Sequence, residues 1–206
     1  MLLCFSSYKD WLVPLNQGDT LVEDALMSLR ALGAPQEDIP LIVRLLENPD
    51  YQIPGFTLFH GAVDLNTHDY IHILLGRGLM PKDEAFTIGF TMGSTNEVSS
   101  IEEELFCTIN RLLYPKLYRF GPEEIAIFKD ALQLGRMSMC QPLNQVDFKD
   151  FAHSTISGMR TALGIEEDLL KAYYAIEAKR YPQAKESERL VSSWQHNDHV
   201  IEGLKH

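Results

Sequence analysis

Two histidines and two carboxylates in this sequence are spaced so that a single metal ion could bind them. His68 and His72 are four residues apart, which puts both imidazoles on one face if the segment is helical. Asp69 then projects about 60° from His72, so the three side chains share one arc of about 100°. Imidazole with carboxylate suits a borderline divalent ion, which we expect to be Zn²⁺, with Fe²⁺, Mn²⁺ and the less favoured Mg²⁺ as alternatives.

Glu84 is the second carboxylate, and helix geometry predicts where it lies. The turn between Gly76 and Pro81 should return the chain antiparallel to the first helix. His72 lies about 7 Å before that turn and Glu84 about 5 Å after it, at a rise of about 1.5 Å per residue. The two side chains can therefore face each other, and a helix N-terminus favours the ionised carboxylate that binds metal. Such a site leaves positions open for water or substrate, although paired histidines on a helix are more often ordinary surface or core groups.

Almost every periodic segment of the chain repeats with a helical period, so we predict an all-α fold. Residues 1–181 are expected to form a single domain, a bundle of about seven to nine helices, and the polar tail at 182–206 is expected to be mobile. The segment after Pro81 is ambiguous, because its large residues alternate with period two, while a stripe of small residues recurs at helical spacing. We favour a closely packed helix there. The helices are expected at about 20–31, 38–47, 67–77, 82–92, 100–114, 122–136 and 165–180, with short helical pieces in 147–163 and a loop at 49–60.

Two of these helices have features that can be compared with a structure. The helix that carries the histidines is expected to begin with Asn66 or Thr67 as its cap. The helix at 100–114 follows two serines and carries three glutamates in its first turn. Its apolar residues fit one face: Ile101, Leu105, Ile109, Leu112 and Leu113.

The composition limits the partners that the protein can bind. Its 206 residues include 18 Lys and Arg and 29 Asp and Glu, so the formal net charge is −11. A basic surface for nucleic acid is therefore not expected. The 3 cysteines are typical of reduced thiols, and the opening segment lacks the basic start and unbroken apolar run of a signal peptide. No apolar run is long enough to span a bilayer, so we expect a cytoplasmic protein, with peripheral attachment to the inner membrane as a further option.

The spacing of the four candidate ligands resembles the signature of a known protein family. His68-Asp69-x-x-His72-x(11)-Glu84, preceded by Thr67, is similar to the HDxxHx(11)E motif of the coenzyme Q biosynthesis protein four family, which belongs to the ubiquinone pathway. This spaced motif is the most specific part of the resemblance, which covers roughly residues 60–170.

Two downstream segments add to the resemblance. Ala131-x-x-x-Gly135-Arg136 resembles the alanine-x-x-x-glycine helix of the family, and residues 160–165 resemble its R-x-x-L-G-I ending. The sequence departs from the family pattern elsewhere. A glycine-rich, tyrosine-containing stretch is replaced by residues 53–58, and a Trp-Glu pair is replaced near residues 146–148.

The resemblance implies an all-helical protein with His68, Asp69, His72 and Glu84 as its metal ligands. The family binds a prenylated quinone precursor, with the isoprenoid tail in an apolar channel and the head group near the metal. It is associated with oxidative decarboxylation of a polyprenyl-hydroxybenzoate-type substrate, and with organising other quinone-pathway proteins at the membrane. A metal can polarise ring substituents or hold the carboxylate in such a reaction. The sequence identifies no catalytic base.

Three further residues are candidates for binding the substrate. Arg77 could place a cation near the metal-bound head group, or it could simply be a charge at the end of a helix. Phe86 and Phe90 could line a lipid channel, or they could fill the core. The sequence also leaves open whether the protein forms a homodimer.

Other functions remain compatible with the same residues. One is a non-catalytic lipid-binding scaffold, and another is a different non-haem metal hydrolase or oxygenase. An HD-type phosphohydrolase would use an additional upstream histidine, for which His60 is the nearest candidate. We expect His60 to be a surface group or a neighbour of the metal ligands, and the histidines at 196 and 199 to lie in the solvated tail.

Overall fold

The computed structural model describes residues 5–32, 59–114 and 119–192. The helix expected at 38–47 and nearly all of the loop expected at 49–60 lie outside these residues. The described residues contain eight α-helices and no strand, which confirms the all-α prediction of about seven to nine helices. Seven of them are α1 (Val22–Arg30), α3 (Leu65–Leu75), α4 (Pro81–Ser94), α5 (Ser100–Leu113), α6 (Pro122–Met137), α7 (Ile156–Leu163) and α8 (Glu167–Arg180), and the eighth covers residues 185–192. Short 3-10 helices lie at Leu15–Gln17, Leu143–Gln145 and Phe148–Phe151.

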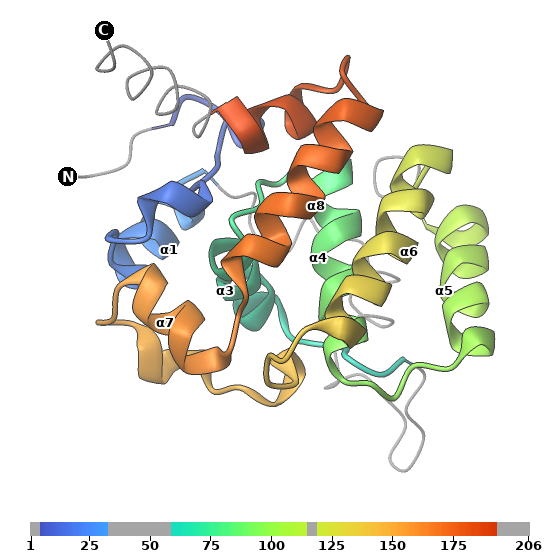
Figure 1. Ribbon diagram of the computed structural model, residues 1–206, viewed down its shortest axis with the longest axis horizontal. Coiled ribbons are helices and arrows are strands. Elements are labelled where there is room, and N and C mark those ends of the chain that lie inside the picture. The colour runs from blue at the N-terminus through green and yellow to red at the C-terminus, as the bar shows by residue number, and fades with distance from the viewer. Residues whose placement is uncertain (1–4, 33–58, 115–118, 193–206) are drawn as a thin grey trace, which may run out of the picture.

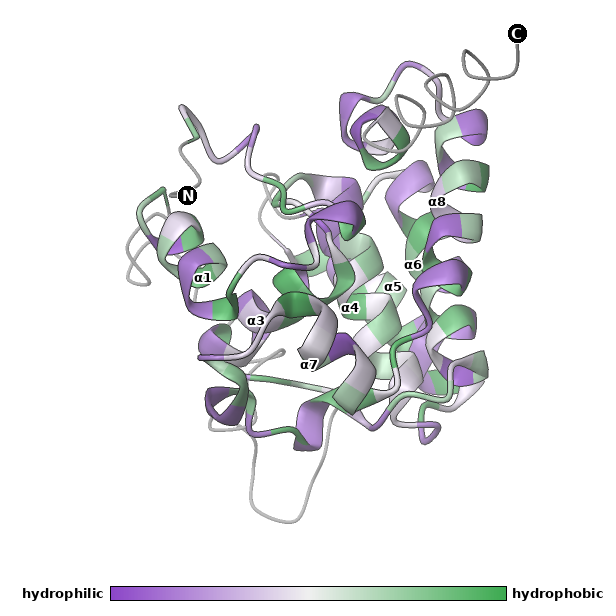
Figure 2. Ribbon diagram, turned by 60° about the vertical axis from the view of Figure 1, so that its left-hand side comes forward, coloured by the Kyte–Doolittle hydropathy of each residue, from purple (hydrophilic) through white to green (hydrophobic). Residues whose placement is uncertain are grey.

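The helices are arranged around a central pair, α3 and α4. In Figure 1, α8 crosses near this pair, α6 and α5 lie successively further out beside α4, and α1 and α7 lie beside α3. Hydrophilic and hydrophobic residues alternate along the outer helices, as Figure 2 shows, which is typical of helices that cover a core. The longest of the named helices, α6, has only 16 residues. Within the described part of the chain, no helix combines the length and apolar character needed to cross a membrane.

The ambiguous segment at 85–92 is part of α4, as we favoured, and its small residues explain why. A Cβ atom added at Gly93 would lie 2.1 Å from the carbonyl oxygen of Leu132 on α6, and one at Gly135 would lie 2.4 Å from that of Phe90. Real Cβ atoms do not approach backbone oxygens so closely, so the two helices meet at a distance that only glycine permits. The stripe of small residues therefore brings α4 and α6 together.

The C-terminal end of α3 is held by side chains from distant parts of the chain. Gly76 adopts the left-handed conformation, with φ of 66°, which ends the helix. Arg160 Nε donates to the carbonyl oxygen of Leu74 at 2.8 Å, and Tyr174 Oη donates to that of Leu75 at 2.6 Å. Both carbonyls lie in the last turn, where no partner exists within the helix itself. The direction of α3, and thus of its histidines, is fixed by α7 and α8.

Part of the segment from residue 182 that we expected to be a mobile polar tail is helical. Residues 185–192 form a helix, and Leu190 in it is only 2% exposed. Arg189 donates from Nη1 to the carbonyl oxygen of Lys9 at 2.8 Å. A few inward-facing residues in a polar stretch were enough to pack this segment against the start of the chain. The rest of the predicted tail lies outside the described residues.

Candidate metal centre

The start of α3 sets the direction of the two histidines. The sequence pattern suggested Asn66 or Thr67 as the cap, but the structure assigns this role to Asp64. Asp64 Oδ1 accepts a hydrogen bond from the backbone nitrogen of Thr67 at 2.9 Å, and its Oδ2 accepts one from the Thr67 hydroxyl at 3.0 Å. An aspartate in this position stabilises the first turn of a helix. His68 follows in that first turn, and His72 lies one turn later.

Three of the four predicted ligands come together between α3 and α4. His68 Nε2 lies 3.1 Å from Glu84 Oε2, and His72 Nε2 lies 3.4 Å from Glu84 Oε1. The two imidazole rings are 4.6 Å apart between centroids. One ligand atom from each of the three residues lies within 4.8 Å of the others, so a single ion could contact all three. The turn at Gly76 brings Glu84 to the histidines, as predicted.

His72 is the most enclosed of the three side chains. It is 1% exposed, and its Nδ1 lies 3.4 Å from the hydroxyl oxygen of Thr87. If Nδ1 carries the proton and donates to Thr87, the Nε2 lone pair is directed at Glu84. Nε2 is buried and has no hydrogen-bond partner among the described residues. A buried nitrogen without a partner is unfavourable in a folded protein, and it is the arrangement expected of a histidine prepared to bind a metal.

Glu84 supplies the charge of the site. Its side chain is 33% exposed, so it is the more open side of the group. Burial raises the pKa of Glu84, but the charge of the nearby His72, together with the charge and hydrogen bond of His68, outweighs this effect and lowers the pKa below its usual range. The carboxyl group is therefore ionised at neutral pH, and an ionised carboxylate is the form that binds a cation.

Asp69 lies beside this group but outside it. Its Oδ2 is 3.8 Å from Arg30 Nε on α1, and the carboxylate is not among the atoms that surround the candidate metal position. Burial raises the pKa of Asp69, while His68 and His72 act in the opposite direction. The predicted arc of three side chains on α3 is thus split, because the aspartate turns toward α1.

Arg77 does not face the candidate metal position. Its side chain is fully buried, with Nη1 donating to Glu177 Oε1 at 3.0 Å and Nη2 donating to Glu177 Oε2 at 2.5 Å. The guanidinium lies over two rings, 3.9 Å from the centroid of Phe86 and 4.2 Å from that of Tyr174. This is a structural ion pair in an aromatic setting. Arg77 therefore has neither of its two predicted roles, which were contact with the substrate head group and a simple charge at a helix end.

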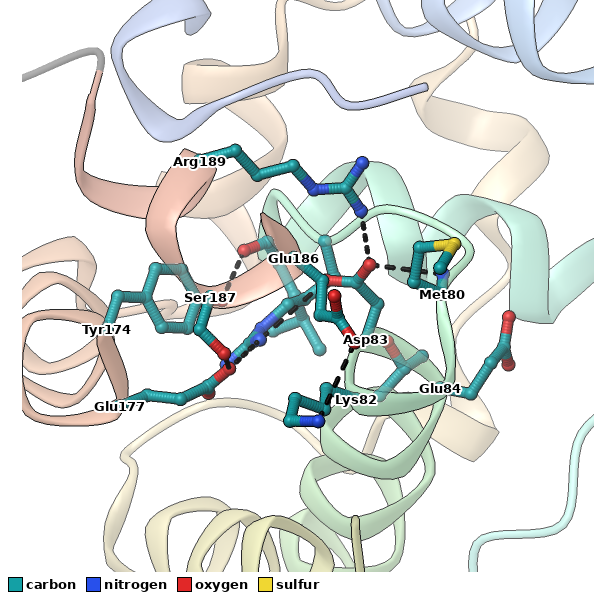
Figure 3. A network of polar contacts seen from close by, with 12 residues as sticks. Met80, Lys82, Asp83, Glu84, Tyr174, Glu177, Glu186, Ser187 and Arg189 are labelled. Atoms are coloured by element: carbon teal, nitrogen blue, oxygen red, sulfur yellow. Dashed lines mark hydrogen bonds and ion pairs between the residues drawn. The ribbon is translucent and has the colours of Figure 1, made fainter. Parts of the chain in front are cut away.

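The buried network around Glu177 continues to the C-terminal helix, as Figure 3 shows. Ser187 Oγ donates to Glu177 Oε1 at 2.9 Å, and Arg189 donates to Asp83, which also accepts from the backbone nitrogen of Met80 at 3.1 Å. Asp83 directly precedes Glu84, and Figure 3 shows the Glu84 side chain pointing away from this network. Sequence reasoning missed these residues, because no local motif marks partners about 100 positions apart.

Phe86 and Phe90, the other predicted substrate contacts, are core residues. They are 0% and 1% exposed, and neither is among the residues that line the pocket beside His68. That pocket is half open and apolar, with a volume of about 30 Å³, which accommodates only a few water molecules. Its lining, which the sequence did not predict, comprises Phe59, Gly61, Ala62, Val63, His68, Ile88, Thr91, Met92 and Phe106.

His60 belongs to a separate pair. Its Nδ1 lies 2.9 Å from Glu102 Oε2, and its ring is 36% exposed. It is not part of the group formed by His68, His72 and Glu84. The additional upstream histidine that an HD-type phosphohydrolase would need is therefore not supplied by His60.

Comparison with known proteins adds no relative from which a function could be transferred. No protein-family model, curated protein or solved structure matches the chain. The argument for function accordingly depends on the three ligand side chains, the motif in which they occur and the pocket beside them.

Proposed function

We propose that the protein binds one divalent metal ion through His68, His72 and Glu84. The observation that carries this proposal is the buried Nε2 of His72, which lies 3.4 Å from the ionised Glu84 carboxylate and makes no hydrogen bond of good geometry within the described part of the chain. Two imidazole nitrogens and a carboxylate oxygen suit Zn²⁺ best, followed by Fe²⁺ and Mn²⁺, and Mg²⁺ least. Three protein ligands leave at least one coordination position for water or a bound molecule.

The resemblance to the ubiquinone-pathway family supports a proposal about what binds there. We infer a prenylated quinone precursor or a similar isoprenoid lipid, with its head group at the metal and apolar atoms toward the pocket beside His68. A bound metal would act as a Lewis acid toward a ring carboxylate or hydroxyl. The chain contributes the orientation of His72 by Thr87 and an apolar wall from Ile88 and Met92. Because the pocket is small, a prenyl chain requires its lining side chains to move.

Metal binding is tested by titrating purified protein, stripped with a chelator, with Zn²⁺, Fe²⁺, Mn²⁺ and Mg²⁺ in a calorimeter. His72→Ala removes one of three ligands, so we expect its affinity for Zn²⁺ to fall at least about 100-fold. His60→Ala is the matched control, since it removes a histidine that lies outside the group. Equal affinities for the wild type and His72→Ala would contradict the assignment. Asp69→Asn reports whether the aspartate joins the ligands once metal is bound.

The hydroxyl of Thr87 offers a second, independent test. Thr87→Val keeps the shape of the side chain but removes the contact with His72 Nδ1, so we expect Zn²⁺ affinity to fall about 10-fold. Thr91→Val is the control, because Thr91 is also buried on α4 but bonds the backbone carbonyl of Thr87 instead. Calorimetry should show a loss of Zn²⁺ affinity for Thr87→Val only. Similar losses in both variants would mean that general changes in α4 cause the effect.

The lipid part of the proposal requires a different measurement. Metal-loaded protein is incubated with a prenylated hydroxybenzoate, and binding and turnover are followed by chromatography and mass spectrometry. Turnover that is lost in His72→Ala supports an enzyme. Binding without turnover supports a lipid-binding scaffold. Turnover of other compounds alone would favour a different metal hydrolase or oxygenase, and failure to bind any isoprenoid lipid while metal binds would refute only the lipid part.

A further inference from the structure

One side of α5 carries large apolar side chains that face away from the protein. Ile101 is 82% exposed, Leu112 is 65% exposed and Leu105 is 41% exposed. At about 100° per residue these three and Thr108 lie within an arc of about 60°. The buried residues of α5 lie on the opposite side of the helix: Phe106, Cys107 and Asn110. The apolar residues that the sequence placed on one face are therefore mostly outside the core.

Within the described residues, the position of α5 leaves this stripe accessible. Figure 1 shows α5 at the edge of the molecule, with α6 between it and α4. Leu113, which is 59% exposed, extends the apolar surface at the end of the helix. Single exposed apolar residues are common, but a continuous stripe along a helix usually marks a contact with a partner.

The charges beside the stripe identify the partner that fits it. Glu104 and Arg111 lie on the same flank, about 20° apart around the helix axis and seven residues apart along it. If two copies of α5 pack antiparallel, equivalent flanks face each other, and Glu104 of each copy lies beside Arg111 of the other. Parallel packing would instead bring this flank against the opposite flank of the other copy, which carries Ile109 and Glu102, and neither complements Glu104. Charge complementarity within one helix thus favours an antiparallel pair.

The apolar residues fit nearly the same two-fold axis, displaced by one residue, or about 1.5 Å, from the one that pairs Glu104 with Arg111. With the axis between residues 106 and 107, Ile101 of one copy lies opposite Leu112 of the other, and Leu105 lies opposite Thr108. In this arrangement Ile101 and Leu112, at the two ends of the stripe, are both buried in the dimer. Glu104 keeps its existing contact with Lys129 at the rim.

We propose that α5 is a self-association surface through which two copies of this chain form an antiparallel, two-fold symmetric dimer. An anionic membrane fits the stripe less well, because Glu102, Glu103 and Glu104 lie on the same helix and the chain carries a net charge of −11. This inference does not depend on the proposed metal or lipid.

Sedimentation velocity over a range of protein concentrations tests the proposal with the full chain. We expect the wild type to be dimeric at about 100 µM, and Ile101→Glu/Leu112→Glu to be monomeric, with a dissociation constant at least about 10-fold higher. Ile176→Glu on α8 is the control, because Ile176 is 52% exposed outside the stripe and its variant should remain dimeric. Circular dichroism checks that all variants fold.

A charge swap tests the antiparallel geometry itself. Glu104→Arg should weaken the dimer about 10-fold, and adding Arg111→Glu in the same chain should restore it, because opposite charges again meet across the axis. A wild type that stays monomeric at about 100 µM, or a dimer unaffected by the changes at Ile101 and Leu112, would overturn the proposal. So would monomeric protein that binds vesicles of anionic lipid through the same residues.

Discussion

Replacing Arg77 with methionine is expected to lower the free energy of unfolding by about 3–5 kcal/mol, because it leaves the Glu177 carboxylate buried without its cation. Both side chains of this pair are 0% exposed, so water cannot replace the lost partner. Ser187 still donates one hydrogen bond to Glu177, but a neutral hydroxyl does not compensate for a buried charge. Urea unfolding followed by circular dichroism measures the change.

Two control variants separate this effect from the loss of any ion pair. Lys171→Met breaks pairs with Glu167 and Asp168, but Lys171 is 39% exposed, so we expect a change below about 0.5 kcal/mol. The double variant Arg77→Met/Glu177→Leu removes both buried charges and should regain at least about half of the lost stability. If Arg77→Met alone costs less than about 1 kcal/mol, the pair is not buried as the structure describes it.

The second large effect is expected for Gly93→Ala, at about 2–3 kcal/mol of lost stability. The added Cβ would lie 2.1 Å from the carbonyl oxygen of Leu132, which is backbone and cannot rotate away, so α4 and α6 must separate. Alanine favours a helix over glycine by about 1 kcal/mol, and this gain is included in the net figure.

A glycine in another helix provides the comparison. Gly158 in α7 is exposed, and a Cβ there would meet only the Thr155 hydroxyl, at 3.1 Å. Gly158→Ala should therefore change the unfolding free energy by less than about 1 kcal/mol in either direction. Urea unfolding of both variants under the same conditions gives the difference. Equal stability of Gly93→Ala and the wild type would show that the two helices do not meet through their backbones.

The parts of the fold that sequence reasoning predicted are those with a local signal. Apolar periodicity located most of the described helices, although it missed the one at 185–192, and the small residues of α4 correctly favoured a helix over a strand. The spacing of His68 and His72, together with the turn at Gly76, was sufficient to predict that Glu84 lies opposite them. Helical geometry alone fixes these relations, so no knowledge of the remaining chain was needed.

The parts that it missed depend on residues far away in the sequence. Asp69 turns toward Arg30 on another helix, and spacing within α3 cannot reveal that choice. Arg77 follows a glycine at a helix end, which suggested a local role, but its partner Glu177 is 100 residues away. The helix at 185–192 lies in a segment predicted to be a mobile tail, because its few inward-facing residues hardly change the polar composition of that segment. A short segment of the sequence does not reveal which way a side chain points or which distant residue it contacts.

The long-range contacts also set an order in which the protein can mature during synthesis. A nascent chain that ends at residue 170 already contains every candidate metal ligand, yet it lacks Glu177, Ser187 and Arg189. Arg77 and Asp83, which flank the turn into α4 beside Glu84, lie 3.7 Å apart and would then lack their other charge partners, Glu177 and Arg189. Contacts that join residues 100, 106 and 180 positions apart form only when α8 and the helix at 185–192 have been synthesised. The candidate ligands are therefore synthesised before the residues that surround them. Because these contacts join distant parts of the chain, we expect folding to be slower than the helix content alone would suggest.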